Sequence, residues 1–430
     1  MRRRGKPETA ARAPWPIARL VRYRDFRLLW VGALFSFTGT WVQNVAQGWL
    51  VYDLTNDAAK LAWVGFAAMA PVALLGPVAG VISDTLNRRR VITIAQSIFA
   101  INALYLAAAT TYGFVSYPQI LVIAVINGCA GAVEMPARQS LISTVVPPEE
   151  VSAAVPVQAM TFNLARVLGP AVGGILLAQV GVGACYLVNG LSYTALIFAV
   201  LAIRADLRAV ARERAPVLDL VTEGMRYTWQ DRRLRTLFLM EAITSGFGVF
   251  YLSLMPAIAR DQLGLDAKGL GHAMSAVGIG AVSALLLMLS LSSRPWKARI
   301  VQIAMTGVGI GLLGMAFARS PWVAFPLFAF VGAGTVMQFN TTNTLFQLIA
   351  PPALKGRVIA MHVWALSGLG PILLPLWGGV AERWGLTVAL AAGGLVVCGG
   401  AFLGWMNRAR LEGVDNLDRV GELGPVLAPG

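Results

Sequence analysis

The feature that most constrains this chain is a series of apolar stretches, each long enough to cross a lipid bilayer. A transmembrane helix needs about 20 predominantly apolar residues. Twelve such stretches can be placed, at 27–51, 61–83, 91–112, 118–145, 152–180, 183–203, 233–259, 269–292, 299–318, 321–349, 358–380 and 386–407. Only 13% of the residues are charged, whereas a soluble domain carries about 25%. The sequence therefore predicts an all-α membrane protein with 12 transmembrane helices.

Lysine and arginine are concentrated in every second connecting segment. If the N-terminus is cytoplasmic, the cytoplasmic segments hold 28 of the 35 lysines and arginines and the opposite side holds 5. Cytoplasmic loops of membrane proteins carry this excess of positive charge. We therefore expect both termini in the cytoplasm. The same distribution accounts for the net charge of +14 without a nucleic-acid partner.

The longest connector divides six expected spans from six. We expect a cytoplasmic N-terminal segment, a first bundle, a linker, a second bundle and a cytoplasmic tail, at 1–26, 27–203, 204–232, 233–407 and 408–430. Within the linker, apolar residues recur at helical spacing: Leu218, Val221, Met225 and Trp229. This pattern predicts a short amphipathic helix on the inner membrane surface. A solvated linker is the alternative.

A weak internal repeat relates the two halves. Leu168-Gly169-Pro170 in the fifth span and Leu369-Gly370-Pro371 in the eleventh are 201 residues apart, and each follows a Pro-Pro pair by a similar distance. The match predicts two pseudo-symmetric six-helix bundles. Repeats related by an axis along the membrane normal belong to one large superfamily of transporters.

The loop after the second span carries the first family motif. It runs from Gly80 to Arg90 as GVISDTLNRRR and resembles the signature loop of the major facilitator superfamily, G-x-x-x-D-R-x-G-R-R. Four positions match: Gly80, Asp84, Arg88 and Arg89. Asn87 replaces a glycine, and we expect it to keep a left-handed turn, which asparagine tolerates. The resemblance implies a latch between the bundles on the cytoplasmic side, whereas the residues alone also fit a plain positively charged loop.

The fifth span carries the second motif. Its segment 166–174, RVLGPAVGG, resembles the G-P-x-x-G-G core typical of export-type members of the superfamily. The matching residues are Gly169, Pro170, Gly173 and Gly174. Small residues at this spacing let helix backbones approach closely, so ordinary tight packing would also explain them.

Three further segments indicate a branch of the superfamily. RDFRLLW at 24–30, MPARQ at 135–139 and FNLAR at 162–166 resemble bacterial exporters grouped with the enterobactin exporter and the transmembrane secretion effector proteins. The resemblance extends over about residues 20–407. It implies proton-driven export across a bacterial inner membrane. Many drug–proton antiporters have R-x-x-x-G in the fourth span, but Ala124 stands at the arginine position here.

Four charged residues lie inside the expected spans and away from the span ends: Glu134, Arg138, Arg166 and Glu241. A charge at mid-membrane costs at least about 2.5–3.5 kcal/mol, so it usually faces a partner or a cavity. Our hypothesis is that Glu134, Arg138 and Arg166 form one cluster in the first bundle. Glu134 is the best candidate proton carrier there, because a carboxylate can lose its charge and an arginine cannot. A static ion pair is the alternative.

Two stripes of amides are candidate cavity residues. Gln43, Asn44 and Gln47 lie close together on the first span, and Asn340, Asn343 and Gln347 recur on the tenth. The resemblance implies that spans one, four, seven and ten line the central cavity. Hydrogen bonding between helices is the alternative use of these amides.

The expected function is export of small apolar or amphiphilic molecules, such as drugs, siderophores or secondary metabolites, by proton antiport with alternating access. An importer, a lipid-moving facilitator and a non-transporting sensor are the alternatives. We expect no enzyme, cofactor or metal site, since His272 and His362 are far apart and no phosphate-binding loop is visible. The expected partners are a small-molecule substrate, protons and the bilayer, with the monomer as the functional unit.

Overall fold

The computed structural model describes residues 16–207, 217–291, 296–351, 354–408 and 411, although side chains at 76–85 and 217–221, among a few others, lie outside the description. The described residues form helices and no strand. In the first half these are α1 (Pro16–Leu20), α2 (Arg24–Thr55), α3 (Ala58–Thr85), α4 (Arg88–Thr111), α5 (Tyr117–Val145), α6 (Val151–Val180) and α7 (Val182–Ala202).

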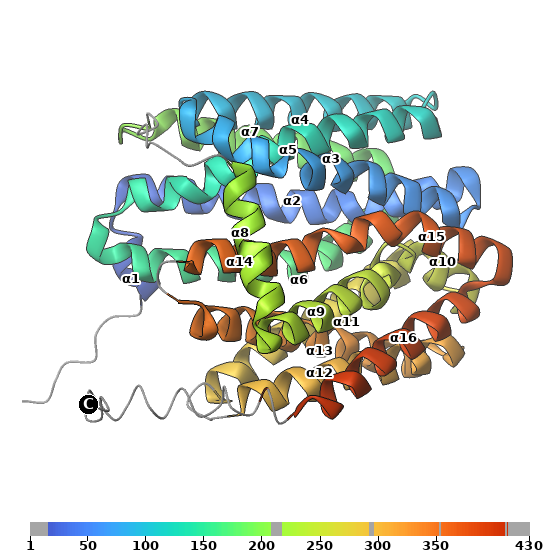
Figure 1. The fold of residues 1–430 in the computed structure, drawn as a ribbon. Coiled ribbons are helices and arrows are strands. Elements are labelled where there is room, and N and C mark those ends of the chain that lie inside the picture. The colour runs from blue at the N-terminus through green and yellow to red at the C-terminus, as the bar shows by residue number, and fades with distance from the viewer. Residues whose placement is uncertain (1–15, 208–216, 292–295, 352–353, 409–410, 412–430) are drawn as a thin grey trace, which may run out of the picture.

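The second half follows the linker. Its helices are α8 (Val217–Gln230), α9 (Arg232–Gly248), α10 (Met255–Ala257), α11 (Ala267–Leu291), α12 (Lys297–Phe317), α13 (Pro321–Ile349), α14 (Lys355–Ser367), α15 (Leu369–Trp384) and α16 (Leu386–Met406). In Figure 1 most long helices run across the view, with α1 at the left and α10 at the right.

The helices account for the expected spans. Ten helical segments of the described chain are long and apolar enough to cross a membrane, with α14 and α15 forming one of them. A bent pair, Arg232–Leu252 followed by Met255–Gln262, makes an eleventh. The 32-residue α2 covers the remaining expected span. The all-α membrane fold predicted from hydropathy is therefore confirmed.

Each half packs mainly within itself. In the first half α2 packs against α6 and α7, and α3 packs against α5. In the second half α13 packs against α11 and α12, and α12 against α16. The main helix contacts between the halves are those of α6 with α11 and of α3 with α15, and α2 also touches α10 and α11.

Glycine makes the contact between the halves close. A Cβ atom at Gly174 of α6 would overlap the Cα atom of Gly271 of α11, so these two backbones touch directly. At the other pair, a Cβ atom at Gly378 of α15 would lie 2.5 Å from Cβ of Ala62 in α3. A larger residue at either glycine would push the halves apart at these points.

The repeated Leu-Gly-Pro triplets occupy equivalent places. Gly169 packs against Trp41 of α2, the first span, and a Cβ atom at Gly370 would lie 3.0 Å from Oγ of Ser245 in α9, the seventh span. Span one is the first span of the first half and span seven is the first span of the second half. The two contacts are therefore equivalent, as a duplication predicts. The halves differ in one respect: α6 continues through its triplet, whereas α14 ends at Ser367 and α15 begins at Leu369.

The linker contains a helix, α8, at the residues where the apolar spacing occurs. A Cβ atom at Gly224 would lie 2.7 Å from the carbonyl oxygen of Arg357, which belongs to α14. Glu223 of α8 forms an ion pair with the side chain of the same arginine. Trp229 lies edge-on to Phe238 of α9. The linker helix is therefore attached to the second half. Its position on the membrane surface stays a prediction, and the side chains of Leu218 and Val221 lie outside the description.

Candidate functional site

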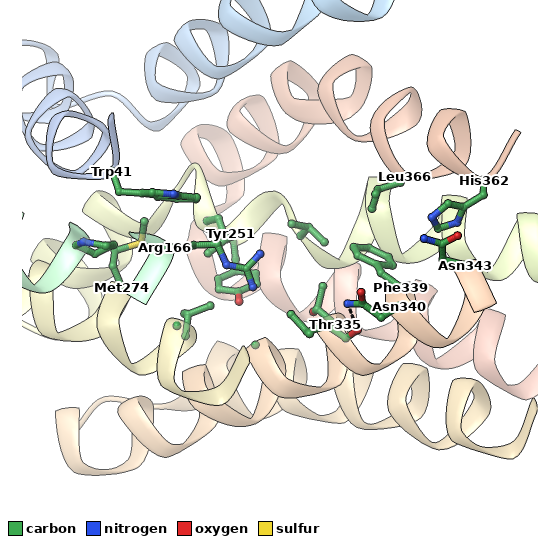
Figure 2. A pocket seen from close by; sticks show the side chains of 17 residues that line it. Trp41, Arg166, Tyr251, Met274, Thr335, Phe339, Asn340, Asn343, His362 and Leu366 are labelled. Atoms are coloured by element: carbon green, nitrogen blue, oxygen red, sulfur yellow. Dashed lines mark hydrogen bonds between the residues drawn. The ribbon is translucent and has the colours of Figure 1, made fainter. Parts of the chain in front are cut away.

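A central cavity of about 330 Å³ lies between the two halves. Residues from α2, α6, α11, α13, α14 and the bent segment after α9 line it (Figure 2). The polar and aromatic members are Trp41, Arg166, Tyr251, Thr335, Phe339, Asn340, Asn343 and His362. The expectation that span four lines this cavity is wrong, because no residue of α5 contributes to its wall. Spans five and eight contribute to the wall, since α6 packs against α11. Span eleven contributes through His362 and Leu366 of α14.

The amides of the tenth span reach this cavity. Asn340 and Asn343 line its wall, and Asn340 donates from Nδ2 to the carbonyl oxygen of Val336 at 2.9 Å. Gln347, one turn further on, is exposed and donates to Oδ1 of Asn343 at 3.0 Å. The spacing of these residues puts them on one face of α13.

The amides of the first span serve other purposes. Gln43 is buried and accepts a 2.6 Å hydrogen bond from Asn189 of α7. It therefore holds two helices together, which is the alternative that the sequence left open. Asn44 is exposed and Gln47 is half-buried, and neither lines the cavity. Trp41 is the residue of α2 that does.

The fifth-span motif sets the position of α6 beside the cavity. Arg166 and Pro170, four residues apart, share a face of the helix and line the cavity. Gly169 and Gly173, also four apart, face α2: a Cβ atom at Gly173 would lie 3.0 Å from Cα of Val42. The glycines bring the helix close to α2, and this placement directs Arg166 inward.

Glu134 and Arg138 form a closed ion pair within α5. Glu134 is 4% exposed, and its Oε1 lies 2.5 Å from Nη2 and 2.6 Å from Nε of Arg138. Gln96 of α4 donates to the same oxygen at 3.1 Å. The guanidinium lies 4.7 Å from the ring center of Phe37. The two charges are thus paired inside the first half, away from the residues that line the cavity, although Nη1 of Arg138 has no hydrogen-bond partner among the described residues.

The three-residue cluster expected from the sequence is therefore incomplete. Arg166 forms no ion pair with Glu134, nor with any other carboxylate whose side chain the structure describes. It lies in the central cavity, close to the Tyr251 hydroxyl (Figure 2). The helical spacing within α5 predicts the Glu134–Arg138 contact, but the rotation of α6 relative to α5 is a tertiary property that spacing does not give.

A second buried pair of titratable side chains lies in the other half. Glu241 of α9 is fully buried, and its Oε2 lies 2.7 Å from Nδ1 of His362 in α14. The second oxygen, Oε1, has no hydrogen-bond partner among the described residues. His362 packs against the ring of Phe346 and lines the cavity. A histidine inside an apolar span is an unusual residue, and this was the signal in the sequence for His362.

Hydrogen bonds and ion pairs between the halves gather at one end of the molecule. Asp53 pairs with Arg260 at 3.2 Å, and the Tyr52 hydroxyl donates to Asp261. Nearby, the backbone N–H of Ala58 donates to Glu382 at 3.1 Å. These residues lie at the ends of α2, α3 and α15 and just after α10. The contacts close the two halves together at the end opposite to the linker helix.

The signature loop lies at the other end. Arg88 donates to Thr144 of α5 at 3.2 Å, and Arg89 donates to the carbonyl oxygen of Ile203 at 2.6 Å. Both contacts stay within the first half. The side chains of Gly80 and Asp84 lie outside the description, so the latch stays a prediction.

The expectation that Asn87 keeps a left-handed turn in this loop is wrong. Asn87 has φ −64° and ψ 113°, so it is extended and not left-handed. Its side chain accepts a 3.0 Å hydrogen bond from the N–H of Arg89 and caps the first turn of α4. Asparagine is one of the residues most favoured at this capping position.

Two helical halves with a cavity between them form the architecture of a major facilitator superfamily transporter. The chain belongs to the transmembrane secretion effector family, whose model matches residues 16–423. It is a multi-pass membrane transporter and not an enzyme.

Characterised relatives cover most of the chain. The multidrug efflux pump Tap of Mycolicibacterium fortuitum is 27% identical over 376 residues, covering 85% of this chain and 91% of the pump. The staphyloferrin A transporter of Staphylococcus aureus is 22% identical over 347 residues, covering 79% and 86%. Macrolide efflux protein A of Streptococcus pyogenes is 22% identical over 394 residues, covering 88% and 95%.

Solved structures share the fold. The D-xylose–proton symporter superposes with a TM-score of 0.69 at 16% identity, covering 90% of this chain and 97% of that one. The nucleoside transporter NupG superposes with a TM-score of 0.68 at 14% identity, covering 89% and 98%. At these identities the likeness shows the fold alone.

Proposed function

We propose that this protein is a proton-coupled exporter of small amphiphilic molecules in a bacterial inner membrane, working as a monomer. The efflux proteins among its relatives support the outward direction. The excess of lysine and arginine supports cytoplasmic termini. The end closed by the Asp53–Arg260 and Tyr52–Asp261 contacts then faces the outside of the cell. The structure then corresponds to the state in which the cavity is reached from the cytoplasm.

Transport follows the alternating-access scheme. The two bundles, 27–203 and 233–407, rock about the midplane cavity. The outer contacts at Asp53–Arg260 and Tyr52–Asp261 break as the Asp84 loop closes the cytoplasmic side. Returning protons drive the cycle, because each charge that moves through 100 mV releases about 2.3 kcal/mol.

The observation that carries the proposal is the hydrogen bond between Glu241 and His362. A carboxylate and an imidazole 2.7 Å apart share at least one proton, and this pair is joined to the cavity through His362. Among the described residues, His362 is the one side chain that hydrogen-bonds to the Glu241 carboxyl group. A substrate in the cavity would therefore contact His362, which shares the proton with Glu241. This contact gives a direct route for exchanging substrate for a proton.

Glu134 is the weaker candidate for this role. Its partner Arg138 keeps its charge throughout the physiological range, so a proton on Glu134 would leave a buried cation unpaired. It also does not line the cavity. We propose Glu241–His362 as the coupling pair and Glu134–Arg138 as a structural pair.

The test is gradient-driven flux in proteoliposomes with an acidic lumen. A panel of fluorescent amphiphiles with negative, zero and positive charge is added outside, and the expected result is accumulation of at least one of them, abolished by a protonophore. Accumulation that instead requires acid on the side of the added compound would indicate an importer. Absence of gradient-dependent flux for every compound would favour a non-transporting membrane protein.

A further inference from the structure

The charge of the cavity wall is unbalanced. Its lining residues include one arginine, Arg166, and no aspartate or glutamate. Tyr251 lies beside it in the wall, and a tyrosine hydroxyl is neutral near pH 7. The other titratable side chain that reaches the wall, His362, is bound to Glu241. The cavity is therefore positive at the end formed by α6 and the bent segment after α9.

A partly buried cation without a carboxylate is costly to hold. Removing a charged group from water costs free energy unless a partner replaces the water. The other intramembrane arginine of this chain, Arg138, has such a partner in Glu134. Arg138, which lies away from the cavity, is therefore paired with a carboxylate. Arg166, which lines the cavity, has no carboxylate partner among the described side chains.

The surroundings of Arg166 can accept the rest of an amphiphilic molecule. Trp41, Met274 and Tyr251 lie around it, and Phe339 lies further along the wall (Figure 2). Asn340 and Asn343 supply amide groups at the opposite end of the view. The volume of about 330 Å³ falls in the range of small-molecule sites, about 300–1,000 Å³.

We propose that Arg166 is an anion-recognition residue and that the cavity selects amphiphilic organic anions. A carboxylate, sulfonate or phosphate group would bind the guanidinium, whose fork of N–H donors fits such groups in a bidentate way. The apolar body would lie against Trp41 and Tyr251. The inference rests on the proposed transport function and adds the charge class of its substrates.

Equilibrium binding to the purified protein in nanodiscs of neutral lipid tests the proposal. The probes share one ring system: naphthalene-2-sulfonate, naphthalene-2-sulfonamide and a naphthyl trimethylammonium ion, whose charges do not change with pH. Wild-type protein is expected to bind the sulfonate at least about tenfold more tightly than the sulfonamide, because hydrogen bonds to charged groups are the stronger ones. The ammonium compound is expected to bind most weakly.

Variants assign the effect to the residue. Arg166→Gln is expected to remove the preference for the sulfonate while sulfonamide binding stays within about threefold, and Arg166→Lys to keep part of it. Arg319→Gln is the matched control, since Arg319 is exposed, lies off the cavity and carries the same charge. Equal binding of sulfonate and sulfonamide by the wild type, preference for the ammonium compound, or unchanged selectivity in Arg166→Gln would each overturn the proposal.

Two sources could supply the anion, a soluble compound or a lipid headgroup. Competition by dihexanoyl phosphatidic acid and by free naphthalene-2-sulfonate is measured in the same nanodiscs, and the stronger competitor identifies the source. If Arg166→Gln fails to fold, the ranking of the three probes on the wild type still decides the proposal. Because binding needs no gradient, a failure of proton coupling would leave this selectivity intact and the two proposals stay distinguishable.

Discussion

The two buried carboxylates among the described side chains lie in different halves and have different partners. Glu134 is bound by Arg138 and Gln96, away from the cavity. Glu241 is bound by His362, which lines the cavity. An arginine partner fixes the charge of a pair, whereas a histidine partner can change its own charge near neutral pH. The comparison supports our proposal that the first half holds a structural pair and the second half a pair able to exchange protons.

The largest expected effect comes from breaking the pair in the first half. Arg138→Met leaves Glu134 buried without a cation, and loss of one partner of a buried pair costs about 3–5 kcal/mol. We expect a marked fall in the unfolding temperature, measured by tryptophan fluorescence in detergent. The double variant Glu134→Gln, Arg138→Met should recover most of the loss. A single variant as stable as the wild type would show that this pair contributes nothing.

The second prediction separates the roles of the two carboxylates. Glu241→Gln removes the proton site and is expected to lower proton-driven flux about 100-fold, equivalent to about 2.7 kcal/mol, while exchange of substrate without a gradient continues. Glu134→Gln is the matched control and should stay within about threefold. Proteoliposome flux with and without a pH gradient measures both. If Glu134→Gln folds and loses coupling while Glu241→Gln keeps it, the assignment is reversed.

The third prediction concerns the histidine of the second pair. His362→Asn can still donate a hydrogen bond but does not change charge between about pH 5 and 8, so flux is expected to fall about tenfold and to lose its pH dependence in that range. His272→Asn on α11 is the control, because His272 is exposed and lies off the cavity. A pH profile of His362→Asn that matches the wild type would exclude His362 from proton exchange.

The smallest effect is expected at the closed end. The Asp53 and Arg260 side chains are 59% and 41% exposed, and an exposed ion pair contributes about 0–1 kcal/mol. Arg260→Gln should therefore raise labelling of a cysteine introduced at half-buried Thr55 by at most about fivefold, in a background whose three native cysteines are replaced by alanine. A conservative Arg260→Lys variant should stay near the wild-type rate. Slower labelling in Arg260→Gln would mean that the pair does not hold this end closed.

Much of the fold could be predicted from local patterns. The length of each apolar stretch sets the helices, and the glycines of the fifth span set close contacts that the structure places against α2 and α11. The i, i+4 spacing of Glu134 and Arg138 was enough to predict their contact. The amide stripe of α13 was also correctly placed on one face, because helical periodicity fixes it.

The site was harder to predict. Glu241 and His362 are 121 residues apart, and their contact depends on how α9 and α14 rotate and pack. The same is true of Gln43, whose hydrogen bond to Asn189 turned an expected cavity residue into a link between helices. Amides and charges inside a span have a partner or a cavity, and the sequence of one helix does not say which.

The sequence by itself determined that the chain is a series of apolar membrane helices and which superfamily it belongs to, because hydropathy and motif spacing are properties of short segments. Only the tertiary structure decided which spans line the cavity, that Arg166 separates from the Glu134–Arg138 pair, and that His362 joins Glu241. The physical reason is that lipid offers buried charges no solvent. Each charge must therefore find its partner across helix interfaces, and those interfaces exist only once the helices have packed.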